Sequence, residues 1–203
     1  MGKNQTIYGL HSVEAALLNH KRINDELIIS ENHRIFSEKH QYNVKKITIL
    51  KSQEFKKNYG ADNTTQGVVL KTQELNTPSL NEFILKESKE KKSVILVLDQ
   101  ITDPQNIGSI MRSCALFNCF GIIVSKDNSP DLTPSLLKAA SGAAELVNYF
   151  KVTNIKRSLF ELKKYGYWIY GFDSSKNAES KINFTKKSVL VFGSEGKGIR
   201  ELV

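Results

Sequence analysis

Short apolar runs alternate with polar, helix-like stretches along the first third of the chain. LIIS (27–30), ITIL (47–50) and GVVLK (67–71) have the length and β-branched content of strands. Ser12 before VEAALLN is typical of the N-cap of a short helix. We therefore expect a compact α/β unit of about seventy residues at the N-terminus.

The pattern changes between residues 73 and 93. Ser79 and Glu82 match a capping box, and the helix they predict has a narrow apolar stripe followed by a lysine-rich end with few apolar residues. Such a stretch is typical of a domain boundary. We expect an N-terminal domain over 1–74, a linker over 75–92 and a second domain over 93–203.

The second domain shows four strands that are apolar at nearly every position: VILVL (94–98), GIIVS (121–125), YWIYG (167–171) and SVLVF (188–192). Helical patterns stand between them, at about 105–118, 133–141 and 155–165. Strands of this kind are covered on both faces, so their alternation with helices predicts a mostly parallel α/β sheet. Ligands of such sheets bind beyond the carboxyl ends of the strands.

Composition narrows the class of protein. With 40% hydrophobic and 25% charged residues the chain has ordinary globular values. Its longest apolar runs are far below the ~20 residues of a membrane span, and the N-terminus lacks a signal-peptide layout. We expect a soluble, cytoplasmic protein without a membrane partner. The net charge of +8 is shared by both halves and favours a polyanionic partner.

Metal ligands and disulfides are not expected. Cys114 and Cys119 lie five apart in an apolar segment, which suits reduced thiols better than a disulfide framework or a zinc site. The four histidines lie within the first forty residues, and none forms the i, i+4 pair of a helical metal site.

The segment after the strand 94–98 reads LDQITDPQNIGSIMRSC. Asp103 and Pro104 begin a helix, Asn106 lies near its start, and Arg112 follows among apolar residues, where a phosphate is the natural partner of a desolvated guanidinium. The alternative is that Arg112 snorkels or pairs with Asp99 or Asp103 while Asn106 only caps the helix.

The segment after the last strand reads VFGSEGKGIREL. Gly193, Gly196 and Gly198 surround Glu195, and glycines after a buried strand allow a ligand to approach the backbone. The spacing matches neither G-x-G-x-x-G nor G-x-x-x-x-G-K-[ST], which argues against hydride transfer and P-loop hydrolysis. Glu195 suits a cationic ligand such as a sulfonium, or a hydroxyl donor; a plain tight turn is the alternative.

Together, LDQITDPQNIGSIMRSC and LVFGSEGKGI resemble the first two signature motifs of the SpoU (TrmH-type) RNA ribose methyltransferases of the SPOUT superfamily. The phrases IYGLHSVEAALL and TQGVVL resemble the N-terminal substrate-binding domain of the subgroup that methylates 23S ribosomal RNA, a domain similar to ribosomal proteins of the L30e/L7Ae type. The resemblance implies methyl transfer from S-adenosylmethionine to a guanosine ribose 2'-hydroxyl.

Residue by residue, the resemblance implies that Asn106, Arg112 and Glu195 are catalytic, and that Gly193, Gly196 and Gly198 line the cofactor site. A guanidinium stays protonated in proteins, so we assign Arg112 to the phosphate next to the target ribose rather than to proton removal. Asn106 and Glu195 would orient the hydroxyl, with Glu195 as proton acceptor.

The resemblance also implies partners. Ribosomal RNA is the expected substrate and tRNA the alternative. A homodimer is expected if the full-length family domain is present. In the N-terminal domain six cations are candidates for phosphate contacts: Arg34, Lys45, Lys46, Lys51, Lys56 and Lys57.

The family's third motif, an Ile-Pro-rich strand and a Ser-Leu-Asn helix, has no match here, so we expect the trefoil-knot segment and part of the cofactor site to be missing. A nonenzymatic RNA-binding remnant therefore stays open. A nucleotide-binding enzyme of another chemistry stays open too, although it would need a phosphate loop that we do not find.

Overall fold

The computed structural model describes residues 3–60, 62–87, 92–172 and 183–203 and divides into two compact units. The first unit comprises residues 1–76 together with 132–146, and the second comprises 77–131 and 147–203. The segment 132–146 is therefore inserted in the sequence of the second unit but packs within the first. The expected domain limits at 74 and 93 stay predictions, and part of the expected linker, residues 88–91, lies outside the described residues.

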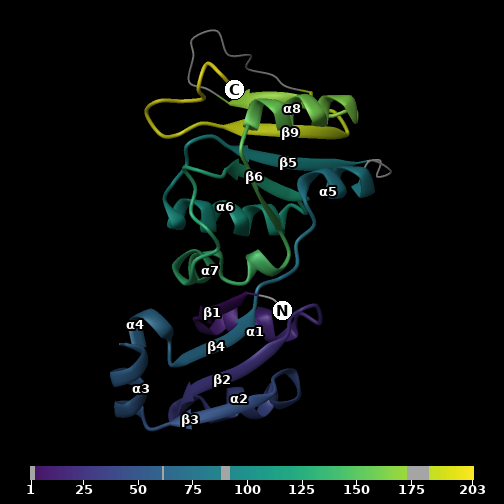
Figure 1. Cartoon of the computed structure of the whole chain (residues 1–203). Coiled ribbons are helices and arrows are strands. Elements are labelled where there is room, and N and C mark those ends of the chain that lie inside the picture. The colour runs from purple at the N-terminus through teal and green to yellow at the C-terminus, as the bar shows by residue number, and fades with distance from the viewer. Residues whose placement is uncertain (1–2, 61, 88–91, 173–182) are drawn as a thin grey trace. The chain divides into compact units, whose positions relative to one another are not determined.

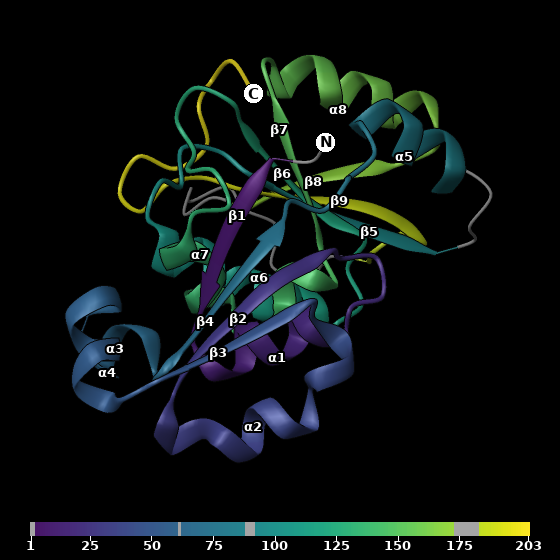
Figure 2. The same cartoon turned by 60° about the horizontal axis from the view of Figure 1, so that its bottom comes forward.

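The first unit is built on a four-stranded sheet of order β1-β4-β2-β3. Figure 2 shows its strands side by side: β1 (Asn4–Tyr8), β2 (Asn24–Ser30), β3 (Lys46–Leu50) and β4 (Val68–Gln73). β2 and β3 are parallel, whereas β4 runs antiparallel to both β1 and β2. The three predicted strands are confirmed, and β1 is an additional strand at the sheet edge.

Helices surround this sheet. They are α1 (Leu10–Leu18), α2 (Arg34–Lys39), α3 (Ser52–Tyr59), α4 (Asp62–Thr65) and α7 (Pro134–Ala140), with 3-10 turns η1 (Glu31–His33), η2 (Gln41–Asn43) and η3 (Ala143–Glu145). The predicted cap of α1 is wrong: Gly9 is the N-cap, and the Ser12 hydroxyl instead donates to the Leu137 carbonyl oxygen at 2.8 Å. This bond spans 125 residues of sequence and attaches α7 to α1.

A buried ion pair fastens the segment 132–146 inside the first unit. The Arg22 guanidinium donates from Nε to Glu145 Oε2 at 2.8 Å and from Nη2 to Oε1 at 2.8 Å, and the two side chains are only 1% and 5% exposed. Nη1 donates to Gln5 and to the Gln73 carbonyl oxygen, and Asn19 donates to Glu145. Because these hydrogen bonds compensate for burial of both charges, the pair holds the segment 132–146 against residues 1–76.

The second unit contains a five-stranded sheet in which every neighbouring pair is parallel, in the order β7-β6-β5-β9-β8. The strands are β5 (Ser93–Leu98), β6 (Gly121–Ser125), β7 (Asn148–Val152), β8 (Trp168–Phe172) and β9 (Lys187–Phe192). The four predicted strands and the parallel α/β class are confirmed. β7, which the sequence pattern did not predict, forms one edge.

Both faces of this sheet are covered by helices. α5 (Leu80–Glu87) and α8 (Ile155–Lys164) pack in one cluster with Ile95 and Val97 of β5, and α6 (Pro104–Leu116) covers the other face (Figure 1). The predicted capping box of α5 is confirmed, because Ser79 and Glu82 each accept a hydrogen bond from the other's backbone N–H. Because helices cover both faces of the sheet, the two motif segments lie beyond the carboxyl ends of its strands β5 and β9.

Candidate active site

The loop after β9 (residues 193–198, the glycine loop) is a closed turn. Ser194 and Gly198 form an antiparallel bridge, and the Gly198 N–H donates to the Ser194 carbonyl oxygen at 3.0 Å. A Cβ on Gly193 would lie 2.0 Å from the carbonyl carbon of Gly198, far inside van der Waals contact. Gly193 is therefore required for the close approach of the two legs of the loop, whatever the loop binds.

The tip of this loop is open. Glu195, Gly196 and Lys197 are exposed. Gly196 has φ +88°, and a Cβ there would meet no atom within 4 Å. Beneath the tip, the Ser194 hydroxyl oxygen is buried without a hydrogen-bond partner in the described part of the chain. The loop thus combines free space, an acidic side chain and an unsatisfied polar atom.

A buried carboxylate joins this loop to the end of β5. Asp99 is fully buried and accepts hydrogen bonds from the Arg200 backbone N–H at 2.9 Å and from Arg200 Nε at 2.9 Å, with Nη2 at 2.6 Å. The hydrogen bond to Asp99 raises the pKa of Arg200. Sequence reasoning weighed Asp99 only as a partner of Arg112 and gave Arg200 no role. Their positions, directly after β5 and after the glycine loop, were the available signal.

The first motif begins on the strand next to β9. β5 and β9 pair in register up to Leu98 and Phe192, so the loops that follow them start side by side. Asp103 is the N-cap of α6 and accepts a hydrogen bond from the Gln105 backbone N–H at 3.0 Å. The suggestion that Asn106 caps this helix is therefore wrong, and the Asn106 side chain is exposed.

Arg112 lies on the exposed side of α6, so the expectation that apolar neighbours desolvate it is wrong. The buried stripe of the helix consists of Ile107, Gly108, Met111 and Cys114. At 100° per residue, Arg112 falls beside that stripe rather than on it. Its Nη2 lies 3.4 Å from the Ser109 hydroxyl. An exposed guanidinium can still bind a phosphate, at a smaller desolvation cost than a buried one.

The six predicted site residues thus form two groups. Gly193, Glu195, Gly196 and Gly198 share the loop after β9, Asn106 and Arg112 share α6, and the link between the groups is Asp99–Arg200. The residues present fit S-adenosylmethionine: the space over Gly196 and the unsatisfied Ser194 hydroxyl offer room and a polar contact, and Glu195 offers a charge for a sulfonium. Their functions stay predictions.

The basic residues of the first unit differ in their partners. Lys45 binds Asp25 at 2.6 Å, and Lys46 binds Glu26 at 2.8 Å. Hydrogen bonds from Lys46, Lys71 and Thr48 lower the pKa of Glu26 to about 2. Two of the six cations expected to contact phosphate are therefore paired with carboxylates. All six side chains lie at the surface, those of Arg34, Lys51, Lys56 and Lys57 included.

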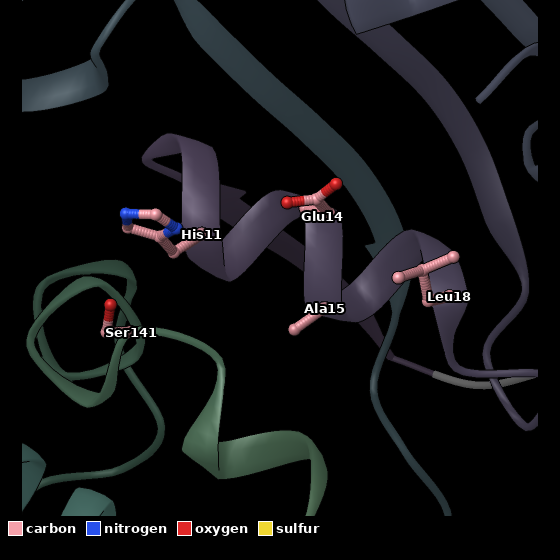
Figure 3. A pocket seen from close by; sticks show the side chains of 5 residues that line it. All are labelled: His11, Glu14, Ala15, Leu18 and Ser141. Carbon is pink, nitrogen blue, oxygen red and sulfur yellow. The ribbon is translucent and has the colours of Figure 1, made fainter. Parts of the chain in front are cut away.

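A pocket of about 430 Å³ lies in the first unit, apart from all the predicted site residues. Figure 3 shows its lining: His11, Glu14, Ala15 and Leu18 of α1, and Ser141 at the end of α7. Within the described ranges, no three His, Cys, Asp or Glu side chains gather as a metal site would require. No described helix is long and apolar enough to cross a membrane.

Comparison with protein families gives two matches. The model of the SpoU rRNA Methylase family matches residues 93–203, and the model of the RNA 2'-O ribose methyltransferase substrate-binding domain matches residues 6–78. Among curated proteins, the 23S rRNA (guanosine-2'-O-)-methyltransferase RlmB of Pseudomonas syringae pv. tomato is 31% identical, over 100% of this chain and 83% of the relative. RlmB of Coxiella burnetii is 32% identical, with 100% and 83% covered.

Solved structures share the fold. The SpoU methyltransferase AviRb from Streptomyces viridochromogenes, in complex with the cofactor AdoMet, matches with a TM-score of 0.78 at 16% identity, over 98% of this chain and 76% of that one. The AdoMet-bound rRNA methyltransferase from Sinorhizobium meliloti matches with a TM-score of 0.75 at 16% identity, over 97% and 73%. The expected SPOUT-type α/β fold is thereby confirmed.

Proposed function

This chain belongs to the SpoU rRNA methylase family, and on that premise we propose that it transfers a methyl group from S-adenosylmethionine to the ribose 2'-hydroxyl of a guanosine in 23S ribosomal RNA. The observation that carries this proposal is the junction at the ends of β5 and β9. There the two motif segments that resemble the family start side by side and are joined by Asp99 and Arg200.

The side chains divide the work of this reaction. Glu195, exposed at the tip of the loop, accepts the proton of the 2'-hydroxyl, and Asn106 orients that hydroxyl with its amide. Arg112 binds the phosphate beside the target ribose through both arms of its guanidinium, which fixes the nucleotide and favours negative charge on the attacking oxygen. Alignment of the oxygen with the methyl carbon supplies much of the rate.

The cofactor site is assigned to the loop after β9. When bound there, S-adenosylmethionine supplies a methyl group on a positively charged sulfur. Gly196 leaves the space for it, the Ser194 hydroxyl donates or accepts a hydrogen bond, and Gly193 and Gly198 hold the turn closed. Before transfer the Glu195 carboxylate would stabilise the positive charge of the sulfonium. During transfer it would accept the proton of the 2'-hydroxyl.

The first unit binds the RNA. Its exposed cations make contacts with phosphates that do not depend on sequence, while the shape of the RNA selects the target. We propose that the protein acts as a homodimer in the cytoplasm, where ribosomal RNA is matured. Transfer RNA is the alternative substrate.

Radiolabelled methyl transfer to 23S ribosomal RNA, followed by mapping of the modified nucleotide, tests this function. We expect a single 2'-O-methylguanosine, and micromolar binding of S-adenosylhomocysteine by calorimetry. Glu195→Gln should abolish transfer, whereas Glu161→Gln, at a half-buried carboxylate of α8, should not. Unmeasurable cofactor binding, with RNA still shifted in a gel, would contradict the proposal for this chain.

A further inference from the structure

Asp99 is a charge in an unusual place. Its side chain is fully buried at the end of the central strand β5, where an unpaired carboxylate would be strongly unfavourable. In the described part of the chain, the hydrogen bonds that compensate this charge come from Arg200: its backbone N–H donates to Oδ2, Nε to both oxygens and Nη2 to Oδ1. Arg200 keeps 37% of its side chain exposed, so the guanidinium retains contact with water.

Both ends of the glycine loop are fixed by this arrangement. The first leg continues β9, whose last carbonyl oxygen, that of Phe192, accepts from the Asp99 N–H at 2.8 Å. The second leg reaches Arg200, whose N–H and guanidinium are held by the Asp99 carboxylate. Between them the Ser194–Gly198 bridge closes the turn. Glu195 therefore has a backbone anchored on both sides.

The same carboxylate also stands at the start of the first motif. Asp99 is followed by Gln100 in a left-handed conformation, with φ 61°, and then by the cap of α6 at Asp103. A single buried group thus stands at the start of the segment that leads to α6 and is hydrogen-bonded to the end of the loop that bears Glu195. Movement of that loop away from the end of β5 would strain the ion pair.

We propose that Asp99 and Arg200 are positioning residues, which hold the Glu195 loop against the end of β5, where the first motif begins, without touching the reacting groups. This inference rests on the proposed function for its catalytic meaning, but its structural content can be measured separately. Arg200 acts through its planar guanidinium: a lysine keeps the charge and the backbone hydrogen bond but loses the paired Nε and Nη2 donors that fix the carboxylate.

Hydrogen–deuterium exchange on the full chain tests the proposal in Arg200→Lys, Asp99→Asn and the double variant. We expect exchange in the peptide 193–203 to rise at least fivefold in each single variant, and no further in the double variant, because each removes the same interaction. Exchange in α8 should not change. Arg157→Lys, an exposed arginine on α8, is the matched control and should leave both peptides as they are.

Methyl transfer by the same variants gives the second readout. We expect kcat to fall about tenfold in Arg200→Lys while KM for RNA is unchanged, since the RNA-binding unit is not altered. Unchanged exchange in 193–203, or an equal rise in α8, would overturn the positioning role. Absence of methyl transfer in the unmodified protein would instead count against the proposed function and leave the exchange result to decide the inference.

Discussion

At the scale of single residues, the charged side chains near the strand ends differ in how the fold treats them. Asp99 is buried and fully hydrogen-bonded, Arg200 is half-buried, and Glu195 and Arg112 face solvent. Buried charges fix the geometry of the site, because breaking their ion pair would leave an uncompensated charge in the interior. Exposed ones are available to a ligand. The sequence pattern singled out Arg112 and Glu195 but not the buried pair. The positions of Asp99 and Arg200 after the strand and the loop were a signal, but nothing local shows that residues 99 and 200 meet.

Arg112→Lys separates a phosphate clamp from a simple positive charge. Lysine keeps the charge and loses the bidentate geometry, so we expect kcat/KM for RNA to fall about tenfold or more. Calorimetric affinity for S-adenosylhomocysteine should stay constant, since Arg112 is assigned to RNA. Arg157→Lys on α8 is the control, and near-normal turnover in Arg112→Lys would rule out the clamp.

Glu26 predicts a dependence of stability on pH. Its pKa lies at about 2 in the folded protein, below the ordinary value of 4.5, because Lys46, Lys71 and Thr48 hydrogen-bond the carboxylate. The stabilisation is therefore complete above the ordinary pKa and is lost as the pH falls from about 4.5 towards 2. Its lysine partners are more than half exposed and screened by solvent, so we expect Glu26→Gln to lower the free energy of unfolding by only about 1 kcal/mol at pH 7.

Urea unfolding at pH 7 and pH 3 checks this expectation. The difference between Glu26→Gln and the unmodified protein should shrink at the lower pH. Glu38→Gln, on the exposed surface of α2, provides the control. A difference that is the same at both pH values would show that the ion pairs of Glu26 do not cause it.

At the scale of elements, the apolar runs predicted every central strand. β5, β6 and β9 are covered on both faces, which makes each of them an uninterrupted apolar run. The missed strands, β1 and β7, are both edge strands and carry polar residues, in the sequences NQTIY and NYFKV. The caps of α5 and α6 followed from local rules, whereas Ser12 failed as a cap because its hydroxyl binds a distant carbonyl oxygen.

Two glycines of one loop should respond differently to the same substitution. Gly193→Ala places a methyl group 2.0 Å from the Gly198 backbone, so the legs of the loop must separate. We expect the free energy of unfolding to fall by about 2 kcal/mol or more, and cofactor binding to be lost. Gly196→Ala meets no atom within 4 Å and bears only the strain of φ +88°, about 1 kcal/mol.

Thermal unfolding and calorimetric titration with S-adenosylhomocysteine measure both losses. The larger loss of stability should belong to Gly193→Ala. If Gly196→Ala lost as much stability as Gly193→Ala, the inference that the tip of the loop has open space around it would be wrong. If Gly193→Ala kept full affinity for the cofactor, the closed turn would not be needed for binding.

At the scale of the whole molecule, sequence order and packing diverge. The segment 132–146 lies inside the stretch that matches the SpoU methylase model, yet it packs with residues 1–76 through the buried Arg22–Glu145 pair. Chain crossings at 76, 131 and 146 therefore connect the two units. A pairing that spans 123 residues cannot be read from local spacing, although the sequence resembles known families in both parts.

The net charge of +8 makes RNA affinity depend on salt, and the first unit determines which cations contribute. With about two or three phosphate contacts, the slope of log K against log salt concentration should be about −2. Lys57→Gln removes an exposed cation of α3 and should reduce the slope by about one unit. Lys45→Gln removes a charge that Asp25 already neutralises at 2.6 Å, and should change the slope much less.

Filter binding at several salt concentrations between about 50 and 200 mM measures the slope for both variants. A larger effect of Lys45 than of Lys57 would mean that the carboxylate pairs open on RNA binding, and that the exposed cations do not define the RNA surface.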